Sequence, residues 1–127
     1  MSNGGMMTGN DPVRDLHAVA EAVQAWQTAT FGGACPMLVR IAKLEEEVAE
    51  LRAAAEAAQA NPCAAMSAQV DEELADVLFL VLDIACGRGM TPARLAAEVA
   101  EKLRKNERRT WAQAQDGQFS HVKGGAR

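Results

Sequence analysis

Hydrophobic residues recur along this chain at intervals of three and four positions, the spacing that places them on one face of an α-helix. The first such stretch follows Asp11-Pro12, a pair typical of a helix N-terminus, and runs to about Thr30. Its apolar positions are Leu16, Val19, Val23 and Trp26. The next segment, residues 31–36, reads FGGACP, and its glycines and proline are expected to break the helix.

A second helix is expected from Met37 until close to Asn61-Pro62. Its apolar residues form a narrow stripe, which suits packing against another helix. These residues are Met37, Ile41, Leu44, Val48 and Leu51. A third helix is expected from about Met66 to Cys86, where Gly87 ends it.

The fourth helix begins at Thr91-Pro92, a second pair of cap and proline, and runs to about Trp111. No segment shows the alternation of apolar and polar residues that is typical of a half-buried β-strand. Four helices with short connections predict an all-α fold, a four-helix bundle completed by oligomerisation. We expect a flexible leader over residues 1–10, a helical domain over 11–111 and an irregular C-terminal tail over 112–127.

Length, charge and cysteine content narrow the functional classes. A chain of 127 residues suits one domain with one core. Its net charge of −4 argues against a general nucleic-acid-binding protein, which needs a basic surface. No apolar run approaches the roughly 18 residues that span a membrane. Three cysteines without metal-ligand spacing indicate a reduced, cytoplasmic protein.

Two acidic pairs carry the candidate chemistry. Glu47 and Glu50 on the second helix, and Glu73 and Asp76 on the third, are each three positions apart, so each pair shares one helix face. Two such helices packed against each other would bring four carboxylates to one point. Mg²⁺ prefers oxygen ligands, and Mn²⁺ can take its place, so this cluster predicts a divalent-metal site.

The third helix makes the stronger case for a metal. It is apolar almost all round, which is typical of a central helix, yet Glu73, Asp76 and Asp83 form a stripe on it. Buried carboxylates need either a salt bridge or a metal ion. Because the neighbouring helix is itself acidic and offers no obvious basic partner, a metal is favoured. On the second helix alone, a solvated acidic face remains an alternative.

The fourth helix carries a basic face that suits phosphate. Lys102, Asn106 and Arg109 lie at positions i, i+4 and i+7, where two cations flank an amide. The alternative is that these cations only complement the dipole at the helix C-terminus.

Together these residues resemble the MazG-like, all-α nucleoside triphosphate pyrophosphohydrolases. The family pattern of ExxE, a spacer and ExxD is matched by Glu47-Val48-Ala49-Glu50 and Glu73-Leu74-Ala75-Asp76. The resemblance extends from about Trp26 to His121. It implies hydrolysis of a nucleoside triphosphate to a monophosphate and pyrophosphate, with a dimer or tetramer as the assembly.

A narrower resemblance is to the phage and bacterial dATP/dGTP diphosphohydrolases. It rests on residues 26–32, 80–85, 102–111 and the tail from Asp116-Gly117 to Val122. This chain departs from that branch at Arg40, which stands near the position where the branch tends to have a histidine. The resemblance favours dGTP and dATP as substrates, in a bacterium or in a phage-infected bacterial host.

The family resemblance also implies roles for single residues. Water activated by metal attacks the α-phosphorus, and one of the carboxylates or the adjacent Glu46 takes its proton. Lys102, Asn106 and Arg109 would hold the β- and γ-phosphates. Trp26 is a candidate for stacking on the base, with packing in the core as the alternative. Asp83 would contact sugar or base, where its two oxygens would favour guanine, or else form a buried salt bridge.

Two other readings of the sequence stay open. The metal motif is shared with relatives that act on other substrates, so the substrate can instead be a pyrimidine triphosphate such as dUTP or dCTP, or it can be phosphoribosyl-ATP. A non-enzymatic helical oligomerisation module would also show alanine-rich stripes with flanking charges, and it predicts no effect of divalent ions. A ferritin-like di-iron site is disfavoured, because neither His17 nor His121 follows a glutamate by three positions.

Overall fold

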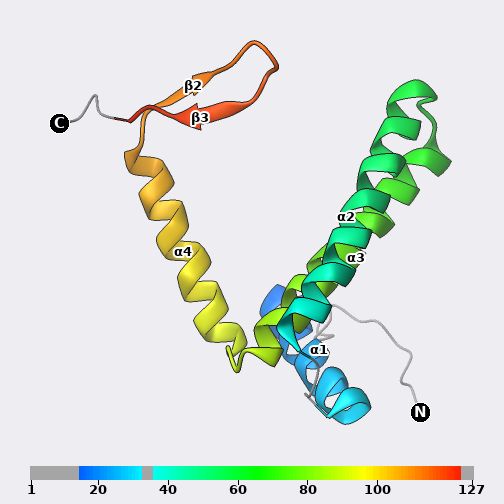
Figure 1. Ribbon diagram of the computed structural model, residues 1–127, viewed down its shortest axis with the longest axis vertical. Helices are drawn as coiled ribbons and strands as arrows, with labels where there is room; N and C mark the ends of the chain where they lie inside the picture. Colours follow the sequence, from blue (N-terminus) through cyan, green and yellow to red (C-terminus); the bar gives the residue numbers. More distant parts are fainter. Residues whose placement is uncertain (1–14, 33–35, 124–127) are drawn as a thin grey trace. The chain divides into compact units, whose positions relative to one another are not determined.

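The computed structural model describes residues 15–32 and 36–123, which form four helices and one short β-hairpin (Figure 1). The elements are α1 (Leu16–Phe31), α2 (Met37–Ala60), α3 (Ala64–Gly87), α4 (Pro92–Arg108), β2 (Trp111–Gln113) and β3 (Phe119–His121). The expected all-α class is confirmed. The chain divides into two compact units, residues 1–93 and 94–127. None of the described helices combines the length and apolar character needed to cross a membrane.

Local capping sets both ends of α1. The Asp15 side chain accepts hydrogen bonds from the backbone N–H groups of His17 and Ala18 and so caps the first turn. Gly32 ends the helix with a φ of 70°, in the left-handed region where glycine has no steric penalty. The expected cap at Asp11-Pro12 lies outside the described residues.

The first unit is built on a long helical hairpin. α2 and α3 lie side by side, joined by the short connection at Asn61, Pro62 and Cys63 (Figure 1). α1 packs against α3, where the Trp26 ring meets Phe79 edge to face and the Cys86 thiol donates to Gln27 Oε1. α3 therefore contacts both other helices of this unit, in agreement with its apolar sequence.

Charged and polar residues make up much of the interior of this unit. Among the described residues, the buried apolar side chains are Ala20, Val23 and Ala85, and the buried polar ones are Gln27, Arg40, Glu47 and Glu73. Side chains of the latter types are rarely buried without a partner or a function. The interior of this unit therefore contains charged and polar side chains that need partners or ligands.

The apolar side chains of α3 are less covered than a central helix predicts. Leu74, Leu78 and Val81 share one face of α3 and are 52 %, 43 % and 36 % exposed. The apolar stripe predicted on α2 is also unevenly covered, since Val48 is exposed whereas Leu44 is half-buried.

The second unit ends in a hairpin that the sequence patterns did not predict. α4 starts at Pro92 as expected but stops at Arg108, three residues before Trp111. β2 and β3 pair antiparallel, with Trp111 opposite His121. Gly117, at a φ of 93°, turns the chain after Asp116, whose carboxylate accepts from the Gln118 N–H.

The expectation of an irregular tail without strands was therefore wrong. The strands span only three residues each, which is too few for an alternation of apolar and polar residues to be recognised in the sequence. The sequence signal that was available is Asp116-Gly117, a dipeptide typical of hairpin turns.

Candidate active site

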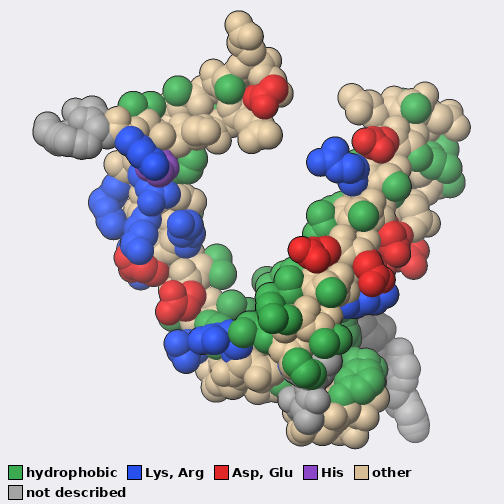
Figure 2. All heavy atoms as spheres, in the orientation of Figure 1, with side chains coloured by type: hydrophobic (Ala, Val, Ile, Leu, Met, Phe, Trp, Pro, Cys, Tyr) green, Lys and Arg blue, Asp and Glu red, His purple; other side chains and the backbone are tan. Residues whose placement is uncertain are grey.

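Three carboxylates from two helices converge in the first unit. Glu47 of α2 and Glu73 and Asp76 of α3 each offer an oxygen atom, and these atoms all lie within 4.8 Å of one another. The i, i+3 spacing puts Glu73 and Asp76 on one face of α3, and the α2–α3 packing brings Glu47 opposite them. Figure 2 shows acidic side chains gathered midway along this helix pair. The predicted convergence of the two motifs is thus observed for three of its four residues.

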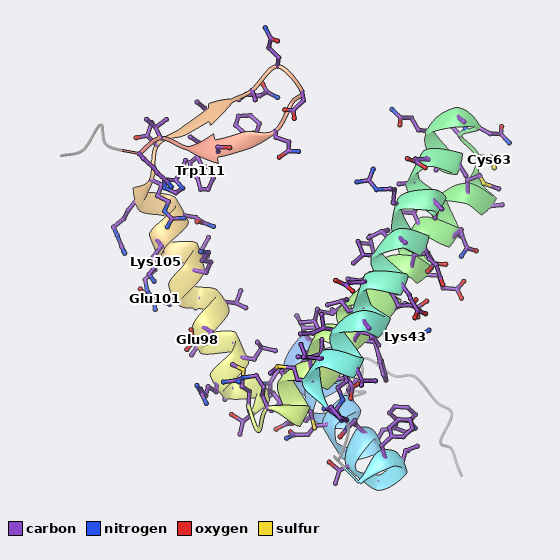
Figure 3. The ribbon with its side chains drawn as sticks, viewed as in Figure 1. Lys43, Cys63, Glu98, Glu101, Lys105 and Trp111 are labelled. Atoms are coloured by element: carbon purple, nitrogen blue, oxygen red, sulfur yellow. The ribbon has the colours of Figure 1, made fainter. Side chains whose placement is uncertain are left out.

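Lys43 is a basic partner of this cluster that the sequence interpretation had overlooked. Its Nζ lies 3.2 Å from Glu47 Oε2 and 3.4 Å from Glu46 Oε1, because the three side chains share one turn of α2. Hydrogen bonds to Glu47 and Glu46 raise the pKa of Lys43, so it stays charged. Figure 3 shows this side chain projecting from the helix pair. One lysine does not neutralise the cluster, which keeps a net negative charge.

The surroundings of Glu73 fit a divalent cation. Gln69 Nε2 donates to Glu73 Oε2 at 2.6 Å, which fixes the carboxylate plane. The other oxygen, Oε1, is buried and has no hydrogen-bond partner in the described part of the chain. A buried carboxylate oxygen without a donor is costly. The cluster is made of oxygen atoms alone, the ligands that hard cations such as Mg²⁺ prefer, so its residues suit such an ion.

Glu50, the fourth predicted ligand, lies beside the three carboxylates rather than among them. Its side chain is exposed, and repulsion from Glu47 raises its pKa, with smaller contributions from burial and from Glu73 and Asp76. Glu50 therefore feels the charge of the whole cluster. Glu46 is 65 % exposed and has no place among the converging oxygens.

An apolar pocket of about 580 Å³ lies between the three helices of the first unit. Its aromatic wall is formed by Trp26, whose ring meets Phe31 and Phe79 edge to face at centroid distances of 5.3 and 5.5 Å. The remaining lining residues are Gln27, Val39, Arg40, Lys43, Leu80 and Asp83. Lys43 belongs to both this pocket and the ion pair with Glu47, so the pocket adjoins the carboxylate cluster.

Asp83 forms the buried salt bridge that was one of its two expected roles. Arg40 Nε lies 3.5 Å from Asp83 Oδ2, and the side chains are only 4 % and 17 % exposed. The two residues connect α2 and α3 and line the pocket. Arg40, noted in the sequence only as a departure from a relative's pattern, is thus a structural partner of Asp83.

Gly87 leaves the space that the Arg40 guanidinium occupies. A Cβ atom at this position would lie 1.5 Å from Arg40 Nη1. Gly87→Ala is therefore expected to displace the guanidinium and lower the free energy of unfolding by about 1–3 kcal/mol, the usual cost of overpacking. Urea denaturation of the variant measures this loss. On an Arg40→Ala background the same substitution should cost nothing, whereas an equal loss on both backgrounds would contradict the clash.

The second unit gathers its cations at the end of α4, where Figure 2 shows Lys and Arg side chains crowded together. Arg109 Nη1 donates to Asn106 Oδ1 at 3.4 Å, and the indole N–H of Trp111, labelled in Figure 3, donates to the Asn106 carbonyl. The pKa of His121 is lowered by burial and by the nearby charges of Arg109, Lys123 and Lys102.

His121 therefore belongs to this basic cluster and to strand β3, where the sequence had predicted an irregular tail. Its ring meets Trp111 edge to face across the hairpin. The predicted phosphate face is extended by Lys123, which the sequence interpretation did not include.

Comparison with known proteins identifies a family whose match covers the carboxylate cluster, the pocket and the basic cluster. The sequence matches the family described as dATP/dGTP pyrophosphohydrolase over residues 19–126, most of the chain. The chain belongs to this family. The match includes both acidic motifs, the aromatic residues of the pocket and the basic cluster, and it confirms the resemblance recognised from the motifs.

A relative of this chain is a dATP/dGTP diphosphohydrolase of Salmonella phage PMBT28. It is 34 % identical over 110 residues, which make up 86 % of this chain and 32 % of the phage protein. The chain thus spans about a third of that relative's length. No solved structure shows significant similarity to the present chain.

The predicted site residues of this chain fall into three groups. Glu47, Glu73 and Asp76 converge, with Glu50 and Glu46 beside them; Trp26 and Asp83 line the pocket; and Lys102, Asn106 and Arg109 lie in the second unit. The residues that sequence reasoning missed are Lys43, Gln69, Gln27 and Arg40. Lys43 and Gln69 had a signal, since each lies four positions before the glutamate it contacts.

Proposed function

We propose that this protein hydrolyses purine deoxynucleoside triphosphates, dGTP and dATP, to the monophosphate and pyrophosphate. The observation that carries the proposal is the adjacency of the carboxylate cluster and the aromatic pocket through Lys43. A nucleotide whose base enters the pocket would have its phosphates beside the carboxylates. The family match and the name of the phage relative support the same reaction.

Carboxylates in such a site need a cation before they can approach phosphate. Glu47, Glu73 and Asp76, together with Glu50, would hold Mg²⁺ or Mn²⁺. When bound, this ion supplies positive charge to the phosphate oxygens and lowers the pKa of water. Gln69 would hold the Glu73 carboxylate in one orientation, as partners of ligands commonly do. Glu46, exposed and outside the cluster, is the group that we assign, with Glu47, to accept the proton of the attacking water.

The aromatic wall of the pocket suits a base. Trp26 is 48 % exposed although it touches two other rings, so one side of the indole remains free for stacking. The basic cluster of the second unit, with Lys102, Asn106 and Arg109, would bind the β- and γ-phosphates.

A substrate panel tests the proposal. The protein with Mg²⁺ is incubated with each of the four dNTPs and NTPs, and released pyrophosphate and orthophosphate are measured separately. Pyrophosphate released fastest from dGTP and dATP supports the proposal. Faster turnover of dUTP or dCTP would favour the pyrimidine alternative, and orthophosphate release would contradict cleavage at the α-phosphorus.

Arg109→Lys is expected to lower kcat/KM by about tenfold or more. The substitution keeps the charge but loses the planar fork that binds two phosphate oxygens at once. Arg108→Lys is the matched control, because Arg108 is the exposed last residue of α4 and has no contact with Asn106 like that of Arg109. Equal losses in both variants would mean that the basic run supports the helix and not the substrate.

We further propose that the protein acts as a homodimer or homotetramer in the cytoplasm, where its nucleotide substrates are found. The exposed apolar face of Leu74, Leu78 and Val81 supports self-association, since isolated chains rarely expose contiguous apolar patches. Light scattering of the purified protein measures the assembly, and a monomer would contradict this proposal.

A further inference from the structure

Three polar side chains with little exposure, one from each helix of the first unit, line the pocket and are here called its floor. They are Gln27 of α1, Arg40 of α2 and Asp83 of α3. Gln27 is fully buried, and Arg40 and Asp83 are paired with each other. Each of the three residues nevertheless keeps one unsatisfied polar atom.

The unsatisfied atoms are two donors and one acceptor. Gln27 Nε2, Arg40 Nη2 and Asp83 Oδ1 are buried and have no hydrogen-bond partner among residues 15–32 and 36–123. The opposite ends of these side chains are engaged: Gln27 Oε1 accepts from the Cys86 thiol, and Asp83 Oδ2 pairs with Arg40 Nε. Three such atoms at one pocket are exceptional, because buried polar groups in proteins are normally hydrogen-bonded.

We infer that Gln27, Arg40 and Asp83 read the edge of a purine base, and that they accept adenine and guanine but disfavour pyrimidines. The inference rests on the proposed function and deepens it by assigning the atoms that select the base. The terminal torsions of Gln27 and Asp83 are soft, so each group can turn its unsatisfied atom toward a ligand in the pocket.

The Arg40–Asp83 pair accounts for acceptance of both purines. The pair keeps one unsatisfied donor, Arg40 Nη2, and one unsatisfied acceptor, Asp83 Oδ1. Guanine meets them with O6 as acceptor and N1–H as donor, and adenine meets them in the opposite order with its 6-amino group as donor and N1 as acceptor. Because Asp83 has a single free oxygen, the two-pronged contact with guanine N1–H and the 2-amino group, which the sequence suggested, is not available.

Gln27 accounts for selection against pyrimidines. Cytosine and thymine present the same donor and acceptor pairs as adenine and guanine on their pairing edges, so Arg40 and Asp83 alone would not reject them. Only purines also carry N7, an acceptor that Gln27 Nε2 can meet. With a pyrimidine, the amide of Gln27 stays buried and unpaired, and a site built for a hydrogen bond rejects a ligand that lacks it.

Base analogues test the inference without any mutation. Binding of dGMP, 7-deaza-dGMP and dIMP to the protein is measured by calorimetry, so that the readout does not depend on turnover. Replacing N7 by C–H should weaken binding by about tenfold, the value of one hydrogen bond. Loss of the 2-amino group in dIMP should leave the affinity within about twofold of that for dGMP, because no floor atom reads it.

A variant supplies the second arm of the experiment. In Gln27→Leu, dGMP and 7-deaza-dGMP should bind equally, and the preference for dGMP over dCMP should shrink. Equal binding of dGMP and 7-deaza-dGMP to the wild-type protein would overturn the inference, as would a loss with 7-deaza-dGMP that persists unchanged in Gln27→Leu. If nucleotides bind with this pattern but are not hydrolysed, the proposed reaction fails while the base-reading role stands.

Discussion

Asp76→Asn is expected to abolish nucleotide hydrolysis while the helical circular dichroism spectrum stays unchanged. The substitution keeps the shape of the side chain but removes one of the three charges that converge within 4.8 Å. Loss of a group that only supports a metal ligand costs about 10- to 100-fold, so loss of a ligand itself should cost more. Asp76 is exposed, and the fold therefore does not depend on it.

The matched control for this variant is Asp71→Asn. Asp71 is also an exposed aspartate of α3, but it is not part of the converging carboxylates. It should retain wild-type turnover. Equal activity in Asp76→Asn and Asp71→Asn would show that the carboxylate cluster takes no part in the reaction. The chain would still belong to the family, but its active site would have to lie elsewhere.

Addition of millimolar Mg²⁺ is expected to raise the melting temperature, and EDTA should reverse the change. A cation held by the cluster would relieve repulsion among the carboxylates and would satisfy the buried Glu73 Oε1. Linkage puts the gain at about 2.7 kcal/mol when the ion is at a hundred times its Kd, on the order of 10 °C for a chain of this size. An unchanged melting temperature would favour the non-enzymatic helical module.

Glu50→Gln provides an internal control for the metal experiment. Repulsion from Glu47 raises the pKa of Glu50 in the folded protein above its ordinary value of 4.5. A raised carboxyl pKa means that the ionised group disfavours the folded state, an effect absent below pH 4.5 and fully present above the raised pKa. The variant should therefore melt higher than wild type in EDTA at neutral pH, lose that advantage at acid pH, and gain less from Mg²⁺.

The positions of the helices could be predicted because the causes are local. Thr91-Pro92 starts α4 and Asn61-Pro62 ends α2 through the backbone of a few neighbouring residues. The i, i+3 spacing of Glu73 and Asp76 likewise places both on one helix face in any fold. The hairpin at residues 111–121 escaped prediction because its strands are too short for a pattern, and its pairing joins residues on both sides of a turn.

Only the tertiary structure decided which side chains from distant segments contact one another. The sequence by itself determined an all-α chain, its two acidic motifs and its family, since spacing and motif are properties of one segment at a time. It did not determine that Arg40 would pair with Asp83, that Gly87 would make room for the guanidinium, or that Gln27 would lie buried with an unpaired amide. Those contacts join α1, α2 and α3, and they exist only because packing brings distant segments together and excludes water from between them.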